Sequence, residues 1–247
     1  MSSRTHKDHL LPDLSKSPDR IAGMFDAIAG RYDVLNHLLS AGIDKRWRRR
    51  AIASLGLTGS ERVLDVCTGT GDLAIAAMTA RPGASTVLGV DFAGAMLRIA
   101  LDKIRAQRLD RAVSLVRGDA TCIPAADASV DAATVAFGIR NVQDTALACA
   151  ELRRVLVPRG RLAILEFGIP TVPLVRPLYL WYFNRVLPAI GRAVSKHHAA
   201  YGYLPASVGA FASPQEFVRL LAQQGFIDVN AQPLTFGIVY LYTARRG

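Results

Sequence analysis

The stretch DVCTGTGDL, residues 65–73, combines residue types that suit the binding of a nucleoside-containing cofactor. Gly69 and Gly71 allow the backbone to pass close to a ligand and to adopt dihedral angles that other residues resist. The loop ends where a helix is expected to begin, and the free N–H groups of a helix N-terminus favour a negatively charged group. Asp91 closes the next predicted strand, where a carboxylate can accept hydrogen bonds from both hydroxyls of a ribose.

Two classes of cofactor compete for this loop. Gly69, Gly71 and Ala74 satisfy the G-x-G-x-x-A form of the dinucleotide fingerprint, so an oxidoreductase that binds NAD is one interpretation. Asp65 lies just before the loop and Asp72 just after it. Two carboxylates repel a pyrophosphate, whereas a cationic sulfonium with an amino-acid tail tolerates them.

Asp119 ends the third predicted strand, where its carboxylate can accept a hydrogen bond from an adenine amino group. Together with an antiparallel-looking strand pair at the C-terminus, these features resemble the class I S-adenosylmethionine-dependent methyltransferases. That resemblance implies S-adenosyl-L-methionine as the cofactor. The cofactor-binding residues expected on this basis are Asp65, Thr68, Gly69, Thr70, Gly71, Asp91, Phe92, Asp119, Ala120 and Ala136. The three cysteines have no paired spacing, which argues against a zinc site or a disulfide framework, and no metal is expected.

The elements around these residues alternate between strand and helix, which indicates a parallel sheet covered by helices on both faces. Strands are predicted at 61–67, 85–91, 112–119, 130–138 and 160–167, with helices at 72–80, 94–108 and 145–156. A further helix at 213–225 precedes two strands, at 226–233 and 234–246, whose very short link suits an antiparallel pair. The expected fold is therefore α/β and Rossmann-like, of the class I methyltransferase type, with a seven-stranded, mostly parallel sheet and an antiparallel last strand.

The chain is expected to form one domain. Residues 1–17 are predicted to be a flexible tail without the apolar run of a signal peptide, and residues 18–247 a single methyltransferase domain. Within it, residues 18–58 are predicted to form a helical N-terminal lid. Residues 169–212, which are aromatic and proline-rich, are predicted to form an apolar insertion on the substrate side.

Four stretches carry a narrower resemblance, to the ubiquinone/menaquinone biosynthesis C-methyltransferase family. They are YDVLNHLLSAGIDKRW (32–47), FGIRN (137–141), RVLVPRGRLAILEFG (154–168) and YGYLPASV (201–208). The resemblance implies methyl transfer from S-adenosylmethionine to a ring carbon of a polyprenyl quinol, either demethylmenaquinol or a methoxy-benzoquinol. The chain departs from the family pattern at Leu35, Asp44, Ala136, Arg159 and Gly168, while Thr70, Asp91, Asp119 and Ala120 keep it.

Methylation of a quinol carbon needs alignment, a group that stabilises phenolate and a proton acceptor. Arg140 is the candidate for the phenolate, either directly or through a water, because arginine stays protonated. Asn141 is expected to fix the same loop, and Tyr32 and Tyr201 are candidates for hydrogen bonds to the quinol. Glu166 ends the fifth strand and is interpreted either as facing the cleft or as holding a backbone group or an arginine.

The net charge of +10 favours an anionic partner. The simplest interpretation of KRWRRR (45–50) is an exposed basic helix face. Among its functional interpretations, transient membrane contact with Trp47 at the interface is favoured over nucleic acid, because a polyprenyl substrate resides in lipid. The stretch 168–191 contains four prolines and two arginines and is not expected to span a membrane. A cytoplasmic enzyme with peripheral contact at the inner face of the membrane is expected, and a homodimer is compatible with the sequence. The alternatives left open are a methyltransferase for another small aromatic or lipid and an RNA-binding methyltransferase.

Overall fold

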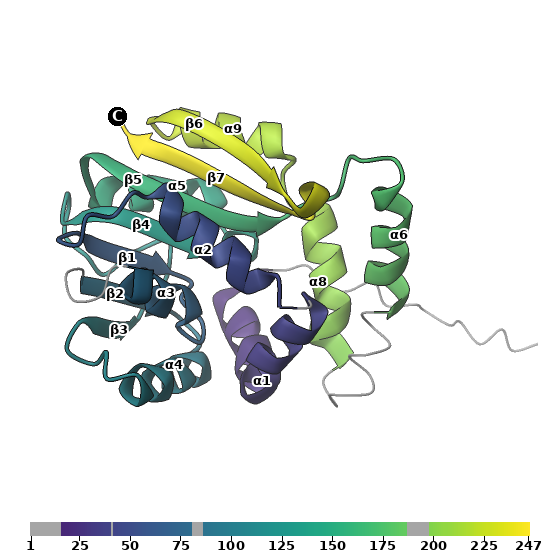
Figure 1. The fold of residues 1–247 in the computed structure, drawn as a ribbon, viewed down its shortest axis with the longest axis horizontal. Coiled ribbons are helices and arrows are strands. Elements are labelled where there is room, and N and C mark those ends of the chain that lie inside the picture. The colour runs from purple at the N-terminus through teal and green to yellow at the C-terminus, as the bar shows by residue number, and fades with distance from the viewer. Residues whose placement is uncertain (1–15, 41, 81–85, 187–197) are drawn as a thin grey trace, which may run out of the picture.

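The computed structural model describes residues 16–40, 42–80, 86–186 and 198–247. Its centre is a seven-stranded sheet in the order β3-β2-β1-β4-β5-β7-β6. The strands are β1 (Arg62–Val66), β2 (Thr86–Asp91), β3 (Val113–Arg117), β4 (Val130–Ala136), β5 (Leu156–Phe167), β6 (Phe226–Leu234) and β7 (Val239–Arg246). Only β7 runs antiparallel to its neighbours within this sheet, so the predicted α/β fold with an antiparallel last strand is confirmed (Figure 1).

The central strands form because their side chains are apolar on both faces. In β1, every residue after Arg62 is buried, and most of β4 is buried as well. Such continuous burial is typical of parallel strands that carry helices on both sides. β5 begins at Leu156 rather than at the expected residue 160, because Leu156 already pairs with Val130 before the register shifts.

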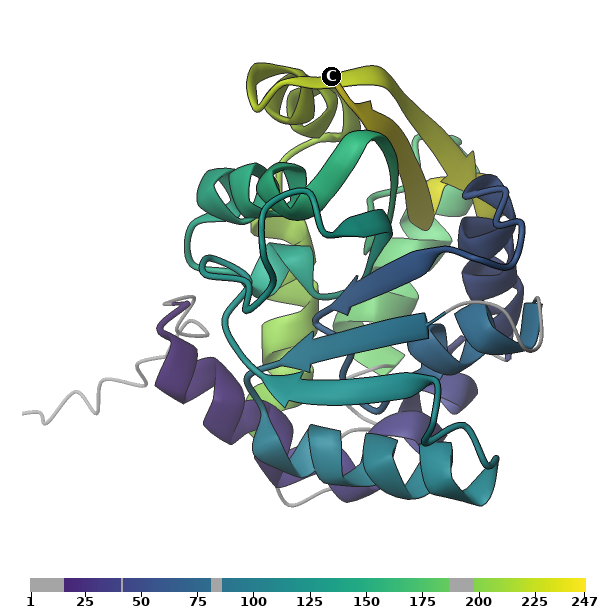
Figure 2. The same cartoon turned by 90° about the vertical axis from the view of Figure 1, so that its left-hand side faces the viewer.

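Two groups of helices cover the sheet, one on each face (Figures 1 and 2). α5 (Thr145–Val155) and α9 (Pro214–Gln223) bury Leu152, Phe217 and Leu221 in one apolar cluster. On the other face, α2 (Asp44–Ser54), α3 (Asp72–Ala80) and α4 (Gly94–Ala106) contribute apolar side chains to a second cluster. Burial of each large aliphatic side chain contributes about 1.5–3 kcal/mol, so the two clusters fix the strand ends that carry the candidate site.

The remaining helices gather beyond the C-terminal ends of the parallel strands (Figure 1). They are α1 (Pro18–Leu39), α6 (Val175–Trp181), the π-helical turn η2 (Tyr182–Val186) and α8 (His198–Ala210). The predicted lid, residues 18–58, therefore contains two helices in different places. α1 packs against α4, whereas α2 packs on α3 and β5 as part of the sheet cover.

The expected interfacial position of Trp47 is wrong. Its side chain is 6% exposed, packs in the second cluster, and donates from Nε1 to Thr235 Oγ1 at 2.8 Å. Arg48 in the same basic stretch is also buried and forms ion pairs with Asp44 at 2.5 Å and Asp72 at 3.1 Å. The two buried residues lie on the face of α2 that packs against the protein, so only the remaining cations of this stretch are exposed. None of the described helices has the length and apolar character required to cross a membrane.

Candidate active site

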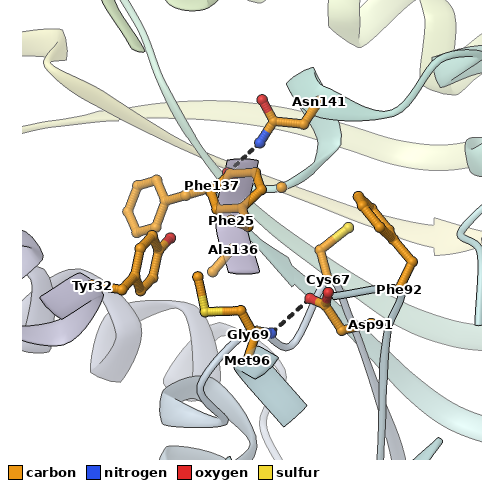
Figure 3. Close-up of a pocket in the computed structure, with 11 residues that line it drawn as sticks. Phe25, Tyr32, Cys67, Gly69, Asp91, Phe92, Met96, Ala136, Phe137 and Asn141 are labelled. Carbon is orange, nitrogen blue, oxygen red and sulfur yellow. Dashed lines mark hydrogen bonds between the residues drawn. The ribbon is translucent and has the colours of Figure 1, made fainter. Parts of the chain in front are cut away.

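A cavity lies at the C-terminal ends of β1, β2 and β4. Parallel α/β sheets bind ligands at this edge, because the strand-to-helix loops converge there. The lining residues come from the loop after β1, the end of β2 and the loop after β4, with helices α1 and α4 closing the space; they are Phe25, Tyr32, Cys67, Gly69, Asp91, Phe92, Met96, Ala136, Phe137, Gly138 and Asn141 (Figure 3). The sequence therefore located the cavity, and six of its expected site residues line it.

Asp91 is the one acidic or basic residue among these described lining residues. Its Oδ2 accepts the Gly69 N–H at 2.8 Å, and its Oδ1 accepts the Ala93 N–H at 2.8 Å. A carboxylate offers about four acceptor sites, so each oxygen keeps one for a ligand hydroxyl. Burial raises the pKa of Asp91, and the backbone N–H groups of Ala93, Gly69 and Phe92 oppose that rise. The Gly69 and Ala93 N–H groups thus fix the orientation of the carboxylate that is expected to bind a ribose.

A second pocket adjoins the cavity, since Phe92 and Asn141 line both. It contains Asp119 and Ala120, the residues expected to contact an adenine. Asp119 Oδ1 accepts the Thr121 N–H at 2.8 Å, which holds the carboxylate in a tight turn after β3. The residues expected to bind ribose and adenine therefore lie in two adjoining pockets that share Phe92 and Asn141.

The two glycines of the loop after β1 serve different purposes. Gly69 has φ +56°, and a Cβ added there would meet nothing within 4 Å, so its backbone borders open space in the cavity. Gly71 has φ +79°, and a Cβ there would lie 3.1 Å from Ala100 Cβ. Gly71 thus allows close packing of the loop against α4 rather than approach to a ligand.

Asp65 and Thr68 support the loop from within the protein. Asp65 is 1% exposed; its Oδ2 accepts the Thr68 hydroxyl at 2.6 Å and its Oδ1 accepts the Thr134 hydroxyl at 2.7 Å. Burial raises the pKa of Asp65 to about 6, and the two hydroxyl donors partly oppose this. Neither residue lines the cavity in the described structure.

Thr70 connects the loop to α1. Its hydroxyl donates to Asp33 Oδ1 at 2.5 Å, while Asp33 Oδ2 pairs with Lys103 Nζ at 2.9 Å. Lys103 also forms an ion pair with Asp72. A second contact joins α1 to the first turn of α4, where Asp26 Oδ1 accepts the Ala95 N–H at 2.8 Å. These contacts hold α1 over the cavity, and they join residues too distant in sequence for local pattern to predict.

Arg140 lies just outside the cavity lining and is 5% exposed. Its Nη1 pairs with Glu166 Oε1 at 2.7 Å and donates to the Phe137 carbonyl at 2.5 Å, and its Nε donates to Ser207 Oγ at 3.3 Å. The guanidinium also lies 5.4 Å from the centroid of Phe167. Glu166 is fully buried and, of the two interpretations given above, holds an arginine. The pair fixes the turn that carries the cavity-lining residues after β4.

The other catalytic candidates differ in position. Tyr32 lines the cavity from α1 and packs edge-on against Phe25 at a centroid distance of 6.0 Å. Asn141 donates to the Phe137 carbonyl at 3.5 Å and accepts the Tyr203 hydroxyl at 3.2 Å. Tyr201 belongs to α8, and its side chain lies outside the described part of the structure.

Sequence reasoning missed several apolar lining residues, among them Phe25, Met96 and Phe137. Phe25 and Tyr32 are seven residues apart on α1 and therefore share a face, which is the signal that could have found Phe25. Cys67 also lines the cavity, and burial together with the nearby carboxylates of Asp91 and Asp65 raises the pKa of its thiol. A neutral thiol is a poor nucleophile, so this environment does not favour Cys67 as a nucleophile.

The amino-acid sequence is similar to that of known methyltransferases. Residues 14–246 match the model of the ubiE/COQ5 methyltransferase family. A relative from Citrifermentans bemidjiense, named ubiquinone/menaquinone biosynthesis C-methyltransferase UbiE, is 46% identical over 94% of this chain and 99% of its own. A relative from Thermus thermophilus, named demethylmenaquinone methyltransferase, is 45% identical over 90% of this chain and 100% of its own.

A solved structure supports the fold. The crystal structure of a SAM-dependent methyltransferase from Aquifex aeolicus superposes with a TM-score of 0.61, covering 81% of this chain and 89% of that one. The sequences are 19% identical, so this likeness concerns the fold alone.

Proposed function

The chain belongs to the ubiE/COQ5 methyltransferase family, and we propose that it transfers a methyl group from S-adenosylmethionine to a ring carbon of a polyprenyl quinol. Demethylmenaquinol is the foremost substrate, with a 2-polyprenyl-6-methoxy-1,4-benzoquinol as a second. The observation that carries the proposal is the 46% identity with a ubiquinone/menaquinone biosynthesis C-methyltransferase over nearly the whole of both chains.

The cavity supports S-adenosylmethionine rather than a dinucleotide. Asp91 retains one acceptor site on each oxygen for the two ribose hydroxyls, and Asp119 and Ala120 lie along the adjoining pocket. No lysine or arginine is among the described residues that line the cavity around Asp91, so a pyrophosphate there would find no side-chain cation, although Lys16 lines the adjoining pocket. A cationic ligand instead meets the Asp91 carboxylate, with the aromatic side chains of Phe92 and Phe137 in the same lining.

When bound, S-adenosylmethionine supplies an electrophilic methyl group on a sulfonium. The protein must then exclude water and hold the quinol ring carbon in line with that methyl. Phe25, Tyr32, Met96 and Phe137 line the cavity with largely apolar surface. We assign them to excluding water and positioning the ring, and Tyr32 stays a candidate for a hydrogen bond to the quinol.

Arg140 and Asn141 are proposed to act at the turn after β4. The Arg140 guanidinium is already paired with Glu166 and bonded to the Phe137 carbonyl. In this arrangement it holds the turn in place and contributes its charge to the phenolate through a water rather than by direct contact. Asn141 holds the same turn through the Phe137 carbonyl. Tyr201 of α8 stays a candidate for a hydrogen bond to the quinol or to the water.

α1 is proposed to be the lid. Asp33 binds Thr70 and Lys103, and Asp26 binds the Ala95 N–H, so the helix is held at two places along its length. Both attachments are polar and partly exposed, and such contacts open at low cost in free energy. Opening would admit the cofactor, and closing would return Tyr32 to the cavity wall.

A polyprenyl substrate implies access to lipid, so we also propose a cytoplasmic enzyme that touches the inner face of the membrane transiently. A homodimer stays a prediction, as do the less favoured alternatives of another small aromatic or lipid substrate and of RNA binding. An NAD-dependent oxidoreductase is disfavoured by the family match and by the lining of the cavity.

Deletion of the gene, followed by mass analysis of the cellular quinones, tests the proposed function. The account expects accumulation of a quinone that lacks one methyl group, and the ring of that species identifies the substrate. Unchanged quinones in the deletion strain would contradict the proposal. Complementation by the intact gene, but not by an Asp91→Ala variant, would link the result to the cavity.

A further inference from the structure

We propose that α6 and the segment leading into it form a docking surface for an anionic lipid bilayer. This inference rests on the proposed function, since it names the surface through which a lipid substrate would be approached. The surface, called the α6 surface below, consists of Ile169, Val172, Leu174, Leu178, Trp181 and Phe236.

Exposed apolar side chains are concentrated on this surface. The described structure has eleven exposed large hydrophobic side chains, and five of them lie between residues 169 and 181. Leu174, Leu178 and Trp181 are 87%, 66% and 59% exposed. Their spacing of four and three residues places them on one side of the helix. Isolated exposed apolar residues need no explanation, but a contiguous row marks a site of interaction.

The opposite side of α6 is fixed to the protein. Tyr179 is 7% exposed and packs in a small apolar cluster with Val208, against Phe167 and Leu204. The helix therefore presents its apolar row outward on a fixed support. A helix with one anchored side and one exposed apolar side can lie in the plane of a membrane interface without crossing it.

Phe236 extends the surface from the turn between β6 and β7. It is 66% exposed and has φ +60°, a backbone conformation that is costly for an aromatic residue. The neighbouring Gly237 packs against the same segment, because a Cβ added there would lie 3.6 Å from Pro170 Cα. The turn and the segment before α6 thus present apolar side chains from adjacent parts of the structure.

The charges around the α6 surface match an anionic bilayer. Between Glu166 and Glu216 the sequence contains no aspartate or glutamate, but it contains four lysines and arginines. Arg176 and Arg185 are exposed on α6 and η2 themselves. Cations beside an apolar row are attracted to lipid phosphates, and tryptophan is favoured where apolar and polar layers meet. Binding of an uncharged protein partner would not explain why this segment lacks aspartate and glutamate.

The position of the α6 surface suits the delivery of a lipid. α6 lies beyond the C-terminal ends of the parallel strands, the same edge of the sheet at which the cavity opens (Figure 1). α8 lies beside α6 in Figure 1, and Val208 of α8 packs in the cluster that anchors Tyr179. Docking through α6 would therefore turn the cavity edge toward the bilayer that contains the prenyl tail.

Sedimentation of the full-length protein with vesicles that contain no quinone tests the inference. One set consists of phosphatidylcholine and the other of phosphatidylcholine with phosphatidylglycerol. We expect binding to the anionic set that weakens as salt is raised. Leu178→Asp and Trp181→Asp should each lower the partition coefficient by about tenfold or more. Ile227→Asp, which adds the same charge at an exposed position at the other end of β6 from Phe236, should leave it unchanged.

Arg176→Gln combined with Arg185→Gln should reduce the preference for anionic vesicles while leaving the apolar contribution. The inference is overturned if the wild-type protein does not sediment with anionic vesicles, or if Ile227→Asp weakens binding as much as Leu178→Asp does. A self-associated wild-type protein that Leu178→Asp dissociates, without vesicle binding, would make the surface an interface between copies and also overturn it.

Methylation of a short-tailed, water-soluble quinol separates this inference from the proposed function. The Leu178→Asp variant should methylate that quinol at the wild-type rate and lose turnover only on a long-tailed quinol embedded in vesicles. Vesicle binding without methylation of either quinol would contradict the proposed function alone. Methylation without vesicle binding would contradict the docking surface alone.

Discussion

Replacement of Asp91 by Asn tests the ribose assignment with almost no change in side-chain size. In the native protein each carboxylate oxygen accepts one backbone N–H, from Gly69 or from Ala93, at 2.8 Å. One acceptor site on each oxygen remains for a ribose hydroxyl. An asparagine has a single acceptor oxygen, and its NH₂ group cannot accept. The NH₂ group can still donate to the oxygen of one ribose hydroxyl, so the variant loses one backbone hydrogen bond and the negative charge that strengthens both ligand bonds.

Each loss has an expected size. A hydrogen bond to a charged group contributes about 1.5–3 kcal/mol and a neutral one about 0.5–1.5 kcal/mol, so loss of the charge from both ribose bonds should weaken S-adenosylhomocysteine binding by about 30- to 150-fold. The lost backbone bond should lower the free energy of unfolding of the ligand-free protein by about 1–3 kcal/mol. Because burial raises the pKa of Asp91, the affinity of the wild-type protein should also fall as the pH is lowered toward that pKa.

Isothermal titration with S-adenosylhomocysteine measures the affinity, and urea unfolding without ligand measures the stability. Asp102→Asn is the matched control, since Asp102 is exposed on α4 and lies outside the cavity lining. An Asp91→Asn variant that binds within twofold of the wild-type protein would refute the reasoning. Equal weakening in the Asp102→Asn control would refute it as well, since the loss would then not be specific to the cavity.

Three further predictions concern groups around the cavity. Arg140→Ala leaves the buried Glu166 carboxylate unpaired and should lower the free energy of unfolding by about 3–5 kcal/mol, whereas Arg140→Met with Glu166→Gln should recover most of it in urea melts. Asp33→Asn breaks the contacts that hold α1 and should speed S-adenosylhomocysteine dissociation about three- to tenfold in stopped flow. Adding Lys103→Met should have little further effect, and additive effects of the two substitutions would show that the two residues do not act together. The native pKa of Asp65, about 6, lies above its unfolded value of 3.8, so the native state binds this proton more tightly. The free energy of unfolding should therefore fall by about 3 kcal/mol as the pH rises from about 4 to about 6, and the Asp65→Asn variant should lack this fall. Parallel pH profiles for the two proteins would contradict the assignment.

Local signals predicted much of the fold and of the residues that meet at the candidate site. Apolar runs such as VLGV (87–90), broken by glycine-rich or acidic turns and separated by helices, permit few arrangements other than a parallel sheet. Because parallel strands end at one edge, residues at three strand ends, including Asp91 and Asp119, had to meet there. The position of a residue at a strand end was therefore enough to locate the two pockets.

Contacts between distant segments were beyond prediction from one sequence. The Arg140–Glu166 pair and the Asp33–Thr70 bond depend on how α1, β4 and β5 pack, and no local pattern encodes that packing. The helices α6 and α8 were also missed, because Pro177 in the first turn of α6 and Pro205 within α8 suggested irregular structure.

The position of Trp47 also depends on contacts between distant segments of the chain. An aromatic residue among five cations suggested an exposed interfacial anchor, yet the side chain packs against Phe137 and Phe167. Tertiary packing determined which face of α2 is buried, and the short helix gave too weak a pattern to predict it. The exposed tryptophan of this structure, Trp181, lies instead in α6.

The most direct test of the central claim is methyl transfer by the purified protein. Reduced demethylmenaquinol would be incubated with S-adenosylmethionine carrying a trideuterated methyl group, and the product analysed by mass spectrometry and NMR. The account predicts a quinol that has gained one intact labelled methyl on a ring carbon, with turnover lost in an Asp91→Ala variant. Recovery of the quinol without label, under conditions where the protein is folded and binds S-adenosylhomocysteine, would contradict it.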